Sequence, residues 1–297
     1  MVTEPSAPAV RVLDSRLRLT ALVNVPAGER RFRVSADDRH VVVSTGEELA
    51  VVDYRGQLLS RLPGEHGVAA PPECHLDCHG VLWVHRPPVD ELVAVEAATG
   101  REIARAKLET ANGEGVFVSD PTGVWTGLHV AMGYYSRSWL VRLESGRIAL
   151  RPLDGESLIG LTPSGDRYFA MPRGFLTVRA VATDQVVAAR HIDDVPGLEE
   201  RTRLLEAAAV VSDELVIVAV NLDDFETDFE EHLLLSARSM RYRSTVEYPF
   251  PMTQNSIYPA DGAGRWLTRS HEERVVRLWR IAGPLDDEAM PGQERLF

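Results

Sequence analysis

The sequence predicts an all-β fold built from a repeated four-stranded unit. Short segments rich in Val, Leu and Trp alternate with turns that carry Gly, Asp, Asn or Pro, and helical periodicity is nearly absent. A unit of about 40 residues recurs along the chain, which is the period of β-propeller blades. Together these observations predict one β-propeller domain, with six blades of four antiparallel strands that bury their faces against one another.

Composition limits the class of protein and its partners. The 297 residues, of which 44% are hydrophobic, are enough to bury a full core, whereas the net charge of −12 repels a phosphate backbone and excludes nucleic acid. No apolar run reaches the roughly 18 residues of a membrane span, and the N-terminus lacks the pattern of a signal peptide. We therefore expect a cytoplasmic, monomeric protein with no membrane partner. Cys74 and Cys78 are expected to be reduced, because their Cα atoms would lie roughly 13 Å apart along one strand.

The two ends of the chain are expected to behave differently from the repeats. Residues 1–9 are polar and contain Pro and Ser, so they predict a disordered lead, and the acidic tail 284–297 is expected to be mobile. The apolar run Leu17–Val25 predicts a strand without a partner nearby in sequence. We expect it to pair with Val275–Ile281 and so to close the ring of a propeller domain that spans residues 10–283.

Five complete repeat units lie between these ends, each with four strand candidates separated by turns. They are Arg31–Leu62, Glu73–Leu108, Val116–Leu153, Ser157–Ile192 and Leu204–Tyr248. In the second unit we expect Glu73–Asp77 to be the innermost strand, and the turn Cys78–Gly80 to be equivalent to Ala36–Asp38. One short helix is predicted over Pro196–Ala207, where Pro and two Glu precede the leucines.

The sixth unit, Asp261–Ile281, reads as a glycine turn, a strand, the charged loop Ser270–Arg274 and a second strand. It resembles the second half of a WD40 repeat, G-x-x-L/I-A-T/S-G-S-x-D-x-T-V-R-L-W-D, with Arg280 in place of the final Asp. The other units match more loosely, as in bacterial WD40-like and YVTN-like propellers. The resemblance implies a propeller that presents loops to a protein or peptide, and it implies that Trp279 is buried between blades.

Propellers commonly bind on the face formed by the loops between the second and third strands of each blade and by the loops between blades. Aromatic and arginine side chains are typical of binding surfaces, because they give rigid contact area and forked hydrogen-bond donors. The candidates at these loops are Tyr134, Tyr135, Arg137, Arg173, Phe175, Tyr248, His271 and Arg274. The alternative for each one is an ordinary loop residue.

An acidic segment, Asp223–Glu231, enlarges the loop of the fifth unit. Carboxylates alternate with Phe225, Thr227 and Phe229, which predicts an extended hairpin; an EF-hand would need a glycine at its centre. This acidic rim would steer a basic partner towards the loop face. Its residues are Asp223, Asp224, Glu226, Asp228 and Glu230. Calcium binding and a merely solvated hairpin remain alternatives.

The stretch Glu73–His79 holds six potential metal ligands in seven residues. Its C-x3-C-H spacing differs from the C-x2-C pair of structural zinc sites, and no second ligand pair follows at a zinc-finger distance. Strand and turn positions account for these residues, so we expect no metal. The alternative is a transition-metal site built from His75, Cys78 and His79.

Motifs of catalysis are missing from the sequence. It contains no G-x-S-x-G elbow, no P-loop and no G-x-G-x-x-G after a strand. Lactonases and strictosidine synthases with six blades hold a cation through Glu, Asn and Asp from separate blades. Here Asn112, Asn221 and Asn255 fall in or next to loops. The sequence therefore favours a non-catalytic, WD40-like scaffold without a cofactor, which binds a protein or peptide that could be basic.

The alternative function is that of a propeller enzyme, a hydrolase, lyase or cyclase that acts on a small molecule at the mouth of the channel. Its polar groups would be Tyr134, Tyr135, Arg137 and His271. A set of channel-lining residues drawn from separate blades leaves almost no trace in the linear sequence, so the missing motifs do not eliminate it.

Overall fold

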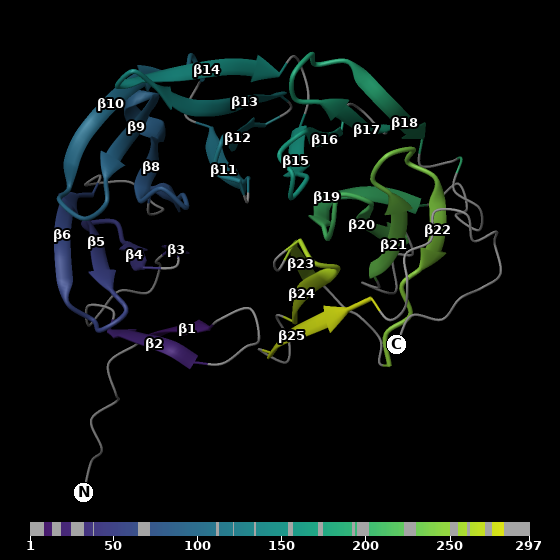
Figure 1. The fold of residues 1–297 in the computed structure, drawn as a ribbon, viewed down its shortest axis with the longest axis horizontal. Helices are drawn as coiled ribbons and strands as arrows, with labels where there is room; N and C mark the ends of the chain where they lie inside the picture. Colours follow the sequence, from purple (N-terminus) through teal and green to yellow (C-terminus); the bar gives the residue numbers. More distant parts are fainter. Residues whose placement is uncertain are drawn as a thin grey trace, which may run out of the picture. The chain divides into compact units, whose positions relative to one another are not determined.

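The computed structural model describes residues 9–13, 19–24, 33–37, 39–64, 72–110, 113–120, 122–133, 135–153, 157–171, 175–191, 194, 202–222, 230–249, 255–259, 262–270 and 275–281. These residues form antiparallel sheets that follow one another in chain order (Figure 1). They belong to two compact units, one within Met1–Ser119 and Gly123–Asp154, the other within Asp120–Thr122 and Gly155–Phe297.

The first unit holds a hairpin and three four-stranded sheets. The hairpin is β1 (Ala9–Leu13) with β2 (Leu19–Asn24). Sheet 1 is β3 (Arg33–Ala36), β4 (His40–Ser44), β5 (Glu48–Asp53) and β6 (Leu58–Pro63). Sheet 2 is β7 (Glu73–Leu76), β8 (Val81–Arg86), β9 (Glu91–Glu96) and β10 (Arg101–Lys107), with the 3-10 helix η1 (Pro87–Val89) between β8 and β9. Sheet 3 is β11 (Glu114–Ser119), β12 (Thr126–Met132), β13 (Tyr135–Glu144) and β14 (Arg147–Leu153).

The second unit continues the series with two four-stranded sheets and, in its described part, one of three strands. Sheet 4 is β15 (Ser157–Leu161), β16 (Arg167–Met171), β17 (Phe175–Ala180) and β18 (Val186–His191). Sheet 5 is β19 (Thr202–Val210), β20 (Leu215–Leu222), β21 (Glu230–Ser236) and β22 (Tyr242–Thr245). Sheet 6 is β23 (Asn255–Pro259), β24 (Arg265–Ser270) and β25 (Val275–Arg280). The all-β class and the division into repeat units are therefore as predicted.

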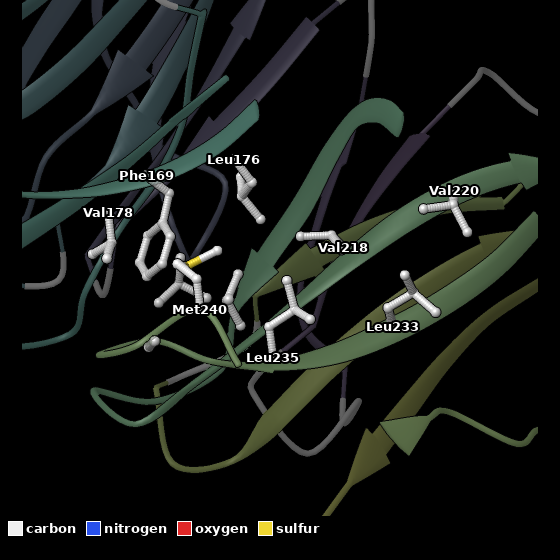
Figure 2. Packing of buried hydrophobic residues seen from close by; sticks show 11 residues of the cluster. Phe169, Leu176, Val178, Val218, Val220, Leu233, Leu235 and Met240 are labelled. Carbon is white, nitrogen blue, oxygen red and sulfur yellow. The ribbon is translucent and has the colours of Figure 1, made fainter. Parts of the chain in front are cut away.

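The strands of these sheets bury alternate residues on opposite faces. On β8, Leu82 and Val84 belong to the apolar cluster between sheets 1 and 2, whereas Trp83 belongs to the cluster between sheets 2 and 3. On β20, Val216 and Val218 likewise pack towards sheet 4, and Figure 2 shows Val218 among the side chains of that cluster. Because side chains alternate along a strand, each of these sheets contributes to two cores at once.

A polar side chain organises the turn between the first and second strands of several sheets. Asp37, Asp77, Asp120 and Ser212 each accept a hydrogen bond from the backbone N–H two residues further along. Such Asx and ST turns replace backbone hydrogen bonds that a sharp reversal cannot make. They also correct the predicted alignment of Cys78–Gly80 with Ala36–Asp38, because the structure makes Asp77 the equivalent of Asp37.

The helix predicted over Pro196–Ala207 is wrong for its second half, which belongs to strand β19. Leu204 pairs with Val220 and Ala208 with Val218, and the register shifts between these two pairs. Strand β20 is buried from Leu215 to Val220, so its backbone groups need partners on both edges, and this demand overrides a weak local helix preference.

The part of the chain that the structure describes contains no helix long and apolar enough to cross a membrane.

The strand expected over Leu17–Val25 is observed as β2, but its partner in the structure is β1. The two strands pair from Ala9 with Asn24 to Leu13 with Leu19. Strand β1 was not predicted, and it begins within the segment that we expected to be a disordered lead. Pairing of the N-terminal strand with β25, and with it closure of a six-bladed ring, stays a prediction.

Candidate binding surface

The loops around sheet 2 are joined to one another by a partly buried set of hydrogen bonds. Asp90, which ends the η1 turn in a left-handed conformation with φ of 55°, accepts the backbone N–H of Thr110 at 2.9 Å on both carboxylate oxygens. The Asp90 carbonyl accepts the backbone N–H of Leu108 at 3.1 Å. The loop between β8 and β9 is thereby fixed to the segment that follows β10.

Several exposed side chains lie next to these joined loops. Lys107 donates to the carbonyl of Val89 at 2.6 Å, and Val89 itself is exposed. Arg137 on β13 donates through Nη1 to the carbonyl of Glu109 at 3.0 Å, while the Glu109 carboxylate lies 3.9 Å from the same nitrogen. An exposed ion pair adds little stability, but together with the carbonyl contact it orients the guanidinium.

Tyr135 opens strand β13 two residues before Arg137. Side chains two apart on a strand share a face, so the phenol ring lies on the same side of β13 as the guanidinium. Tyr135 is 74% exposed, more than any other large hydrophobic residue in the described part of the chain. We call the set Val89, Lys107, Glu109, Tyr135 and Arg137 the Tyr135 surface.

The second unit carries another predicted aromatic at a comparable position. Phe175 opens β17, is exposed, and contacts the ring of His191 edge to face with centroids 4.6 Å apart. Several candidates lie outside the described residues, namely Tyr134, Arg173, His271, Arg274, Asp223, Asp224, Glu226 and Asp228. For Glu230, the first residue of β21, only the backbone is described. Convergence of the whole set on one face stays a prediction.

Tyr248 connects sheets 5 and 6. Its hydroxyl accepts the indole N–H of Trp266 at 3.0 Å and lies 2.6 Å from Nδ1 of His232. Its ring meets Trp279 edge to face, 4.8 Å between centroids. These contacts are structural, and the predicted binding role of Tyr248 is untested.

Trp279 packs against the apolar cluster between sheets 5 and 6, as the sequence predicted, but it is only half-buried. Its Nε1 donates to the Thr268 hydroxyl at 2.8 Å. The neighbouring Trp266, which is 2% exposed, fills the centre of the same cluster.

The potential metal ligands of sheet 2 point in different directions. His75 stacks on Phe117 with ring centroids 5.8 Å apart, and burial lowers the pKa of His75 to about 4 despite the opposing attraction of Asp77. Cys78 and His79 lie in the turn and face Gly123, where an added Cβ would be 2.2 Å from Sγ and 2.8 Å from Nε2. Among the described residues no three His, Cys, Asp or Glu side chains could hold a metal ion. Cys74 and Cys78 are not joined in a disulfide bond.

No protein-family description matches the sequence, and no curated protein matches it. Solved structures do match. The β-propeller domain of Cps50 (Swd1) from Myceliophteria thermophila is 12% identical and superimposes with a TM-score of 0.63, covering 92% of this chain and 91% of that one. The fold is a β-propeller.

Other propellers are similar over comparable lengths. Hydrazine synthase of Kuenenia stuttgartiensis has a TM-score of 0.61 at 12% identity, with 92% of this chain and 90% of that chain covered. KlAtg21 in complex with the coiled coil of AgAtg16 has a TM-score of 0.53 at 12% identity, with 81% and 77% covered. At such low identity these likenesses establish the fold alone.

The propeller repeat explains why Tyr135 and Phe175 are comparable. Each is the first residue of the third strand of its sheet, β13 in sheet 3 and β17 in sheet 4. The sequence did not single out Val89, Lys107 or Glu109. One signal was available, since Lys107 is the only lysine of the chain and ends strand β10 before the loop between sheets 2 and 3.

Proposed function

We propose that this propeller is a non-catalytic scaffold that binds a protein or peptide partner on the Tyr135 surface. The observation that carries the proposal is an exposed tyrosine beside an arginine whose guanidinium is held by the Glu109 carbonyl. Aromatic and arginine side chains dominate the binding energy of protein interfaces, and an oriented side chain loses less entropy when a partner binds.

Two further observations support a macromolecular partner. The loops beneath the surface are joined through Asp90 and Thr110, so the surface is preorganised on a rigid base. KlAtg21, a propeller of similar fold, is solved in complex with a coiled coil. In this proposal Tyr134 extends the same surface. The acidic rim Asp223–Glu230 attracts a basic partner, and this electrostatic attraction weakens as the salt concentration rises.

The test is affinity capture from the native host followed by mass spectrometry, with wild type and the double variant Tyr135→Ala/Arg137→Ala as baits. The variant should lose the specific partner while its melting temperature stays nearly unchanged, because both side chains are exposed. The matched control is Tyr258→Ala/Arg147→Ala, which removes the same residue types at exposed positions on other strands. Partners retained by the first variant, or lost equally from both, would contradict the proposal.

Lys107 allows a second, independent readout. It is the only lysine, and its side chain is 65% exposed at the edge of the Tyr135 surface. A short amine-reactive photo-cross-linker should therefore join the captured partner to Lys107. The control Lys107→Arg keeps the charge but removes the amine, and any cross-link that survives it must come from the N-terminus.

A small-molecule enzyme is the second candidate, and the likeness to hydrazine synthase is the observation that favours it. Its site would lie at the channel mouth, with Tyr134, Tyr135, Arg137 and His271 as polar groups. Elemental analysis of the purified, unchelated protein distinguishes the two. A stoichiometric divalent metal, lost when carboxylates or Asn from several blades are replaced, would favour the enzyme over the scaffold.

A further inference from the structure

His85 lies near the end of β8, just before the η1 turn that carries Val89 of the Tyr135 surface. It is completely buried, and its Nδ1 would lie 2.3 Å from a Cβ added at Gly115 on β11. Within the described part of the chain, neither ring nitrogen makes a hydrogen bond. The ring is therefore held by packing, and a proton on it would need a compensating charge or water.

The segment that joins β10 to β11 connects this ring to the Tyr135 surface. Near its beginning, the carboxylate of Asp90 accepts the backbone N–H and the hydroxyl of Thr110. At its end, Gly115 packs on the buried imidazole. Glu109, which precedes Thr110, presents the carbonyl that holds the Arg137 guanidinium. A shift of this segment at either end therefore changes how Arg137 is held.

Two non-glycine residues of this connection adopt the left-handed conformation. Asp90 has a φ of 55° and Glu109 a φ of 57°. This region costs free energy for a residue with a Cβ atom, and it persists where surrounding contacts hold it. The hydrogen bonds between Asp90 and Thr110 supply such contacts, so the loss of these bonds would let the segment relax to another shape.

Asp90 also acts electrostatically on His85. Its negative charge favours a proton on the ring, whereas burial has the larger effect and lowers the pKa of His85 to about 4. A protonated ring would compete with Thr110 for the Asp90 carboxylate. The titratable and charged groups on the described elements around the ring are Glu73, which pairs with His85 from β7, Asp90 after η1, Glu114 on β11, and Arg137 on β13, in the same row of paired residues as Gly115.

We propose that a proton taken up by His85 draws the Asp90 carboxylate away from Thr110 and opens the segment between β10 and β11. The opening frees Arg137, so the Tyr135 surface loses an oriented contact in acid. In the open state water reaches the ring, which then titrates near its ordinary pKa of 6.5 rather than near 4. Because the open state binds the proton more tightly, the equilibrium constant for opening should rise about twentyfold from pH 7 to pH 5. Release of a partner rests on the proposed function, whereas the opening does not.

Hydrogen–deuterium exchange of the full chain, followed by mass spectrometry, tests the opening. Exchange in residues 108–115, corrected for the effect of pH on the chemical exchange rate, should become about twentyfold faster between pH 7 and pH 5. Strands β8 and β12 should stay protected, because the opening is confined to the segment. Equal acceleration in these strands would mean that the whole interface loosens, and it would overturn the proposal.

Variants at two histidines of sheet 2 identify the group that takes up the proton. His85→Leu cannot be protonated, so the corrected exchange rate of its segment should hardly change with pH. His75→Leu is the matched control, because the pKa of His75 is also lowered to about 4 but its ring stacks on Phe117. This control should keep the wild-type response. His85→Gln gives the same comparison if His85→Leu does not fold, and an unchanged acid response in the His85 variant would contradict the assignment.

The partner captured at neutral pH gives the readout for function. A wild-type bait should release it in a wash at pH 5, whereas a His85→Leu bait should retain it. If exchange confirms the opening and both baits retain the partner, the partner does not bind the Tyr135 surface, and the proposed function fails while the opening stands. Equal release from both baits would mean that another titrating group governs binding, and it would overturn the role of His85 in it.

Discussion

The interface between sheets 4 and 5 and the interface between sheets 2 and 3 are built from the same repeat but packed differently. The first is formed by aliphatic side chains with Phe169 and Met240 (Figure 2). The second contains Trp83 and Trp139, and on the same strand as Trp83 it also buries His85 completely. One repeat thus tolerates both an interface whose buried cluster is apolar and one that buries a titratable ring beside its apolar cluster.

His85 destabilises the interface between sheets 2 and 3. In the part of the chain that the structure describes, neither of its ring nitrogens has a hydrogen-bond partner. The ring packs directly on the backbone of Gly115, where an added Cβ would lie 2.3 Å from Nδ1. A buried polar group without a partner costs about 1–3 kcal/mol, so this interface should be the weaker and more pH-sensitive of the two.

The largest expected effect is in the apolar interface. Phe169→Ala removes a fully buried ring and should lower the free energy of unfolding by about 3–5 kcal/mol, because the surrounding side chains cannot refill the space. Urea denaturation followed by circular dichroism measures it. A loss below about 1 kcal/mol would mean that the side chains around Phe169 refill the space that its ring leaves.

Gly115→Ala tests the close approach in the other interface. The new methyl group would overlap His85 Nδ1, and we expect a loss of about 1–3 kcal/mol. Gly46→Ala is the control, since nothing lies within 4 Å of its Cβ position. Combining Gly115→Ala with His85→Ala should recover part of the loss. Strictly additive effects in this double-mutant cycle would show that the two residues do not interact.

Acid should weaken the interface that contains His85. Burial lowers the pKa of His85 to about 4, against the opposing attraction of Asp90, whereas the unfolded chain protonates this group near its ordinary value of 6.5. Between these values the unfolded state binds more protons, so stability is full above pH 6.5 and falls as the pH drops to about 4. The slope contributed by one such group is at most about 1.4 kcal/mol per pH unit.

His85→Leu is the variant that isolates this contribution. It should be about 1 kcal/mol more stable than wild type at pH 7, because an unpartnered polar ring is replaced by an apolar side chain of similar size. Its stability should also fall less steeply between pH 6.5 and 4. His75, whose pKa is lowered to about 4 as well, would account for part of the remaining slope. If the pH dependence of stability were the same in His85→Leu as in wild type, groups other than His85 would be responsible for the acid sensitivity.

The smallest effect is expected from Met240→Leu in the apolar interface. Met240 is fully buried, but the exchange nearly conserves volume and adds no polar atom, so the loss should be about 1 kcal/mol or less. Thermal unfolding measured beside Phe169→Ala gives the comparison. A loss as large as that of the Phe169 variant would show that shape, rather than apolar volume, controls this interface.

The sequence predicted the sheets well because the turns that separate their strands are determined by residues close together in the sequence. Strand boundaries follow from turn residues such as Asp37 and Asp77, whose side chains organise the backbone within a few residues. The first part of strand β19 was mistaken for a helix because its partner β20 lies further along the chain and decides its conformation. Strand β1 was missed for a similar reason, since only pairing with β2 reveals it.

The sites could be predicted less completely. Tyr135 and Arg137 were chosen as candidates from their residue types and their position at a loop, and their binding role stays a prediction. Glu109, whose carbonyl orients Arg137, is 28 residues away and has no distinguishing neighbours in sequence. The packing between sheets is harder still to predict, because Leu49 and Val95 meet only when sheets 1 and 2 stack, and nothing in the sequence tells these residues from other buried aliphatic residues.

The order of strands within the sheets has a consequence for synthesis on the ribosome. Every hydrogen-bonded strand pair in the described sheets joins strands that are consecutive in the chain. A unit of about 40 residues takes roughly 2–8 s to emerge at 5–20 residues per second. Hairpins form in about 1–10 μs, so the strands of one sheet can meet long before the next sheet is translated. Each nascent sheet then waits for seconds with an apolar face uncovered, the interval in which chaperones would have to protect it.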